Sequence, residues 1–131
     1  MNMVTIYDLN GNVVRELEFK KVEPWPNKYC RITTTDDKVI LTNMPVAAEG
    51  AACYLSAREP TLKEIEASEI FNITMILGQP GGRLVRKWEN ARWFLQSEGV
   101  VWFMHGNGMV CVAGPVLIEN FRNTCSGSGV G

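Results

Sequence analysis

The chain has one histidine, His105, among its 131 residues. A Ser–His–Asp or Cys–His site needs a histidine as its base, so any such site would have to use His105. This residue ends an apolar run and precedes Gly106-Asn107-Gly108, which is typical of a hairpin turn. We therefore expect His105 to lie at a turn edge or an interface, and the sequence predicts no catalytic residue.

Metal-binding and nucleotide-binding motifs are also missing. The cysteines are widely spaced and form no C-x-x-C pair: Cys30, Cys53, Cys111 and Cys125. Structural zinc needs four nitrogen or sulfur ligands at close spacing, and a P-loop needs Gly-Lys-Ser/Thr. We expect no metal and no cofactor. In a reducing cytosol the cysteines would be small buried apolar side chains, whereas one or two disulfides in an exported product are the alternative.

Long apolar runs and a strong net charge are absent. The longest apolar stretch, residues 109–118, contains Gly114 and Pro115 and is too short to span a bilayer. The first eight residues lack the basic and apolar regions of a signal peptide. A formal net charge of −1 gives no general attraction to nucleic acid or anionic membranes. We expect a cytoplasmic protein without membrane association, with a virion location as an alternative.

What is present is an ordinary globular composition, with 46% hydrophobic and 21% charged residues. This length suits one domain. We expect a single globular domain over residues 1–123, followed by a flexible Gly/Ser tail over residues 124–131.

Most of the chain has the patterns of short strands joined by tight turns. The Asn10-Gly11 turn predicts a first hairpin over residues 3–22, which Pro24-Trp25-Pro26 then interrupts. The small residues at 46–52 predict a loop. The remaining expected strands are 29–34, 38–42, 52–57, 70–77, 100–105, 109–113 and 116–118.

Two segments predict helices. Thr61 and Glu64 have the spacing of a capping box, which predicts a short helix over 61–69. Leu84, Trp88, Ala91 and Leu95 recur at helical spacing over residues 83–99, although two strands at 83–88 and 92–96 are the alternative. The predicted fold is strand-dominated α+β: an antiparallel β-sandwich or half-barrel with one or two helices packed on one face. A nearly all-β fold is the alternative.

Charge is distributed unevenly although its sum is small. Residues 59–69, which include Glu66 and Glu69, contain four glutamates and one lysine. Residues 83–92 contain four basic residues, among them Arg86 and Arg92, and one glutamate. These segments are either solvated or paired within the chain, or they meet on different copies and drive assembly.

Two tryptophans are candidate interface anchors. On a helix over 83–97, Trp93 would lie opposite the apolar stripe and close to Arg86. Exposed tryptophan beside arginine is typical of protein interfaces. Trp25 is a second candidate, although a tryptophan between two prolines can also plug the end of a sheet.

The leading functional hypothesis is a non-catalytic interaction or assembly protein, whose partner is another protein or a second copy. A virion or phage accessory component, or a small inhibitor of another protein, would fit this profile. The first alternative is a small-molecule-binding domain or small enzyme whose pocket is lined by His105, Trp88 and Trp102. The second is a weak single-stranded nucleic-acid binder through residues 83–93.

Overall fold

The computed structural model shows a strand-dominated antiparallel fold, as the composition and turn pattern predict. It describes residues 2–50, 60–78, 82–97, 99–106 and 108–120. Within these residues one α-helix accompanies ten strands, so the fold lies close to the nearly all-β alternative. The predicted strand over 52–57 and the predicted tail over 124–131 lie outside the described residues.

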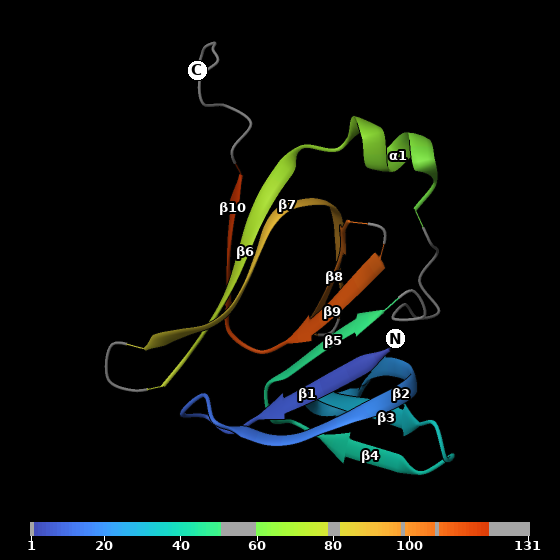
Figure 1. Ribbon diagram of the computed structural model, residues 1–131, viewed down its shortest axis with the longest axis vertical. Coiled ribbons are helices and arrows are strands. Elements are labelled where there is room, and N and C mark those ends of the chain that lie inside the picture. The colour runs from blue at the N-terminus through green and yellow to red at the C-terminus, as the bar shows by residue number, and fades with distance from the viewer. Residues whose placement is uncertain (1, 51–59, 79–81, 98, 107, 121–131) are drawn as a thin grey trace.

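The ten strands form one continuous antiparallel sheet (Figure 1). Their bounds are β1 Met3–Tyr7, β2 Val13–Trp25, β3 Tyr29–Thr34, β4 Val39–Thr42, β5 Val46–Gly50, β6 Ile70–Leu77, β7 Arg83–Ser97, β8 Val100–His105, β9 Gly108–Ala113 and β10 Val116–Asn120. Their order across the sheet is β10-β6-β7-β8-β9-β5-β1-β2-β3-β4, so β10 and β4 form its two edges.

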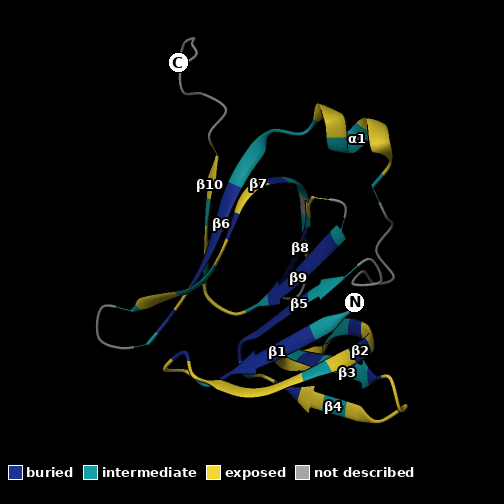
Figure 2. Cartoon of the chain, viewed as in Figure 1, coloured by how far each residue is buried: buried dark blue, intermediate teal, exposed yellow. Residues whose placement is uncertain are grey.

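The sheet buries both faces of its central strands. In β8, Trp102 packs into one hydrophobic cluster, whereas its neighbours Val101 and Phe103 pack into another. Strands β2 and β3 contribute to the first cluster, and β6 and β7 contribute to the second. Because successive side chains of a strand point to opposite faces, the two ends of the sheet must cover opposite faces of its centre. Figure 2 shows this buried centre, with exposed residues concentrated toward the outer strands.

The helix predicted over residues 83–99 is wrong, because residues 83–97 form the long strand β7. Trp88 and Ala91 are three residues apart, yet both are buried in the same cluster. A bulge explains this: β7 uses the three steps from Trp88 to Ala91 where β6 uses the two from Ile73 to Phe71. The extra residue brings Ala91 back to the same face as Trp88. Two residues three positions apart therefore share one face, which is the spacing expected of a helix.

Two further predictions are wrong: the loop over residues 46–52 and the interruption of the strand at Pro24. Residues 46–50 form β5 rather than a loop, and Ala47 and Ala48 are buried in different clusters. The chain does not break at Pro24, because β2 continues to Trp25. There β2 pairs only with β3, since its pairing with β1 ends at Glu18. An open strand edge tolerates a residue without an N–H donor.

The helix α1, Leu62–Ala67, begins with the predicted capping box. Glu64 N–H donates to Thr61 Oγ1 at 3.1 Å, and Thr61 N–H donates to Glu64 Oε1 at 2.9 Å. None of its residues is buried, so this helix covers little of the sheet.

Candidate functional site: a protein interface at strand β4

The edge strand β4 and the outer face beside it carry three of the exposed large apolar side chains: Trp25, Val39 and Leu41. We call this the β4 surface, and its residues are Glu23, Trp25, Arg31, Val39 and Leu41. They share one face because β2, β3 and β4 pair in register, with Glu23 opposite Arg31 and Arg31 opposite Leu41. Val39 is 50% exposed and Leu41 is 48% exposed.

The backbone of β4 also presents N–H and C=O groups to the open edge at Val39 and Leu41. Thr34 N–H donates to the Lys38 carbonyl at 2.9 Å, which makes Thr34 and Lys38 a hydrogen-bonded pair. Such pairs alternate along an antiparallel ladder. Ile40, opposite Ile32, is therefore bonded to β3, whereas the N–H and C=O groups of Val39 and Leu41 point toward the open edge. Within the described part of the chain, no strand pairs with that edge.

Trp25 is held in place on this surface. Its side chain is 40% exposed, and the Arg31 guanidinium carbon lies 5.1 Å from the centroid of its ring. Arg31 Nη1 in turn donates to Glu23 Oε2 at 2.8 Å. A cation–π contact between partly exposed groups is worth about 0.5–1 kcal/mol. The three side chains form a row across β2 and β3 that needs little reordering on binding.

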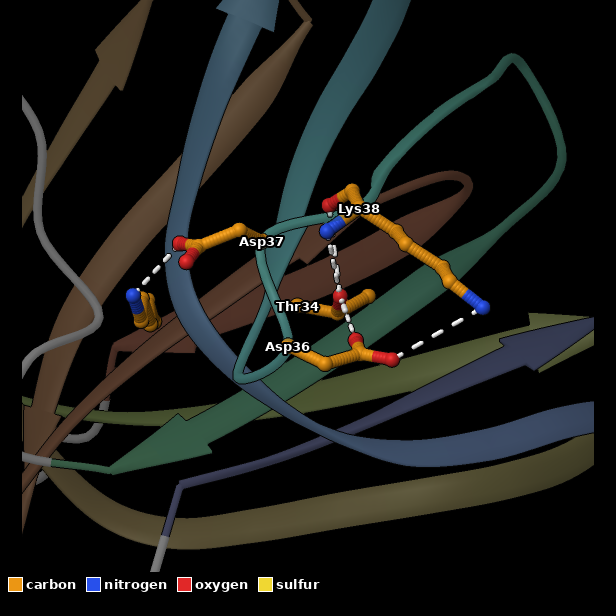
Figure 3. A network of polar contacts seen from close by, with 5 residues as sticks. Thr34, Asp36, Asp37 and Lys38 are labelled. Atoms are coloured by element: carbon orange, nitrogen blue, oxygen red, sulfur yellow. Dashed lines mark hydrogen bonds and ion pairs between the residues drawn. The ribbon is translucent and has the colours of Figure 1, made fainter.

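The turn before β4 fixes the direction of the strand (Figure 3). Thr34 Oγ1 donates to Asp36 Oδ1 at 2.5 Å and accepts from Lys38 N–H at 3.0 Å. The hydrogen bond from Thr34 lowers the pKa of Asp36 below its ordinary value, because it stabilises the carboxylate. Asp37 has a φ of 65°, the left-handed conformation that this short hairpin connection requires. The turn therefore sets the register that leaves Val39 and Leu41 facing outward.

The opposite edge of the sheet differs in its charge. Strand β10 carries the exposed residue Glu119, and its Asn120 donates a hydrogen bond to Glu69. Charged side chains on an edge strand oppose pairing with another strand. Strand β4 contains no charged residue between its first and last positions. Of the two edges, β4 is therefore the one open to strand addition.

The predicted anchors on β7 take different positions from Trp25. Trp93 is half-buried and packs against the first hydrophobic cluster, so it does not lie on an outer helical face. Its φ is 52°, and its N–H donates to Ser68 Oγ at 2.6 Å. Arg92 Nη1 donates to the Ser68 carbonyl at 3.3 Å. The basic segment and the acidic segment thus meet within one chain at Ser68.

Arg86 belongs to a polar network that involves β7, β5 and β1. Its Nη2 lies 2.8 Å from Glu49 Oε2, and Trp88 Nε1 donates to the same oxygen at 2.6 Å. Burial disfavours the charged guanidinium, but the hydrogen bond from Arg86 to Tyr7 and the attraction of Glu49 together raise the pKa of Arg86. This network links β7 to β5 and β1, which are not neighbours of β7 in the sheet order.

The predicted acidic candidates lie near α1. Glu66 is exposed on α1, and Glu69 follows the helix, where it accepts the hydrogen bond from Asn120. The structure places both far along the sheet from β4, near strands β6 and β10 (Figure 1).

The predicted pocket residues are not brought together. Trp88 and Trp102 are buried in different clusters, and His105 is exposed opposite Gly108. Cys111 lies opposite Trp102 and not opposite His105. Because Trp88 is only 2% exposed, it cannot stack on a base while the core stays closed. This arrangement favours neither the tryptophan-lined pocket nor the nucleic-acid alternative.

Among the residues that the structure describes, no three His, Cys, Asp or Glu side chains cluster as metal ligands would. Across the same residues no helix has the length and apolar character needed to cross a bilayer. Comparisons of the chain with protein-family models, curated proteins and solved structures gave no match.

Proposed function

We propose that this chain is a non-catalytic assembly protein that pairs with a second copy of itself through β4. The observation that supports this most strongly is the coincidence at Val39 and Leu41. Each has an outward-facing backbone and a side chain about half exposed. Strand addition uses those two features together, since main-chain hydrogen bonds give affinity and alternate side chains give specificity.

The edge is complementary to itself in an antiparallel arrangement. With a two-fold axis at Ile40, Val39 of one copy pairs with Leu41 of the second copy, and the reverse pair forms beside it. These two pairs satisfy the N–H and C=O groups that face the edge in a single chain. The same register places Lys38 opposite Thr42, so no like charges face each other across the junction.

Trp25 and Arg31 extend the contact beyond the two strands. In this dimer the apolar side chains of both β4 strands would form one patch, with the stacked Arg31 and Trp25 at each side. Tryptophan and arginine are enriched among the residues that contribute most to interface energy. Because Glu23 already holds Arg31, ordering these side chains on binding would cost little side-chain entropy.

Sedimentation velocity over a wide range of protein concentration tests the proposal. The wild-type chain should show a concentration-dependent dimer, and Leu41→Lys should be monomeric because it places a charge at the junction. Leu117→Lys is the matched control, since Leu117 is also 48% exposed but lies on β10. A wild-type monomer at all concentrations, or a dimer that Leu117→Lys disrupts and Leu41→Lys does not, would overturn the proposal.

A further inference from the structure

A cavity of about 340 Å³ lies among connections between the strands, and no residue of the β4 surface lines it. Five connections between strands meet there: those after β1, β2, β4, β7 and β9. The side chains that shape it are mostly apolar, with one cation and one amide: Leu9, Met44, Pro45, Ala113, Lys28 and Asn43. This volume falls within the range of small-molecule sites, which are also mainly apolar with a few polar groups.

Of the described residues that line this cavity, Lys28 alone carries a charge. Among the described residues it forms no ion pair, whereas Lys20, Lys21, Lys38 and Lys87 each lie within 4.0 Å of a carboxylate. Across residues 2–50, 60–78, 82–97, 99–106 and 108–120, no aspartate or glutamate lines the cavity beside it. An ammonium group at the wall of a mainly apolar cavity, with no counterion among the residues that the structure describes, favours an anion as the occupant.

The backbone at this lysine is strained. Lys28 has a φ of 65° and follows Asn27 at 66°, so two successive residues with side chains adopt the left-handed conformation. Asparagine tolerates this conformation better than lysine does. Gly99 lies beside Lys28 at the cavity: a Cβ built on Gly99 would lie 3.9 Å from Lys28 Cγ. The connection between β2 and β3 therefore has a lysine beside the cavity at a position where a glycine would be less strained.

We propose that this cavity binds a small organic monocarboxylate with a short apolar body. The carboxylate would lie against the Lys28 ammonium and the Asn43 amide, and the hydrocarbon would contact Leu9, Met44 and Pro45. This site is independent of self-association, because none of the residues that form the β4 surface lines it.

Titration with hexanoate, followed by amide correlation NMR, tests the site. Hexanoate should shift the amides of Lys28, Asn43 and Gly99 saturably, and hexanamide, which is uncharged, should bind at least about tenfold more weakly. Lys28→Met should weaken hexanoate binding by a similar factor, whereas Lys28→Arg should retain it. Lys38→Met is the control, since Lys38 lies outside the cavity, and it should bind as the wild type does.

Lys28→Gly separates binding from folding. This substitution removes the ammonium and relieves the left-handed backbone, so it should raise the thermal midpoint while abolishing the hexanoate shifts. The proposal is overturned if hexanoate gives no saturable shift at these amides, or if Lys28→Met binds as tightly as wild type. Inorganic phosphate binding as tightly as hexanoate would also overturn it, because the apolar wall would then select nothing.

Discussion

Arg31 on β3 stacks over Trp25 on β2, with its guanidinium carbon 5.1 Å from the ring centroid. Nη1 of the same guanidinium lies 2.8 Å from Glu23 Oε2. Arg31 belongs to β3, which is the strand next to the edge strand β4. Trp25 is 40% exposed, so this contact lies on the surface of the sheet. In the assembly that we propose, this contact would link β2 and β3 to the junction at β4.

Replacing Trp25 should weaken the dimer more than it weakens the fold. Trp25→Ala removes contact area beside the junction. We therefore expect the dissociation constant of the dimer to rise at least about tenfold. Trp25 is 40% exposed, so the free energy of unfolding of the monomer should fall by no more than about 1 kcal/mol. Sedimentation equilibrium and urea unfolding measure the two effects. Equal dimer affinity in wild type and variant would remove Trp25 from the interface.

Replacing Glu49 should destabilise the fold itself. Glu49→Ala leaves the indole N–H of the buried Trp88 without its acceptor and leaves Arg86 without its carboxylate. An unsatisfied buried donor costs about 1–3 kcal/mol of unfolding free energy. Glu89→Ala is the control, because the pair of Lys87 with Glu89 is exposed and should contribute less than about 1 kcal/mol. Urea denaturation should therefore rank Glu49→Ala well below Glu89→Ala in stability.

Replacing Asn72 should destabilise the fold at the β7 bulge. Asn72 is 8% exposed, and its Oδ1 accepts a hydrogen bond from Asn90 N–H at 3.1 Å where the ladder is interrupted. Asn72→Ala should lower the unfolding free energy by about 0.5–1.5 kcal/mol, since the Asn90 N–H loses its acceptor in a partly buried hydrogen bond. Asn43→Ala, at an exposed asparagine, should change it by less than about 0.5 kcal/mol. If thermal unfolding shows no difference between the two variants, the Asn72 bond contributes nothing to the bulge.

The Asp36 turn should make stability fall at acidic pH. The hydrogen bond from Thr34 lowers the pKa of Asp36 from its ordinary value of 3.8, so the folded chain holds the proton less tightly than the unfolded chain. The stabilisation is fully present above pH 3.8 and is lost as the pH falls through the lower folded pKa. Asp36→Asn should flatten this part of the profile of urea midpoint against pH. A profile identical to wild type would show that Asp36 does not contribute.

The hairpins were predictable because each turn is local. Asn10-Gly11 and the capping box of Thr61 and Glu64 require only neighbouring residues, and the structure confirms both elements. Strand β7 was not predictable in this way. Its helical spacing arises from a bulge that exists only because β6 pairs beside it. Likewise, Ala47 and Ala48 look like loop residues until strands on both sides bury them.

The candidate interface was predictable only in part. Trp25 was a candidate from its sequence neighbours, but its stacking partner Arg31 comes from the next strand. Val39 and Leu41 alternate with Ile40 in an uncharged segment, which is a signal for a strand with two apolar faces. That β4 lies at the sheet edge depends on the order of all ten strands, and no local pattern encodes that order.

Amide hydrogen exchange along β4, measured by NMR at low and high protein concentration, tests the assembly proposal most directly. The Ile40 amide is bonded to β3 within one chain, so its protection should depend little on concentration. The Val39 and Leu41 amides should become protected only as the dimer forms, because their acceptors belong to the second copy. If Val39 and Leu41 exchange equally fast at both concentrations while a dimer is present, the copies do not pair through β4.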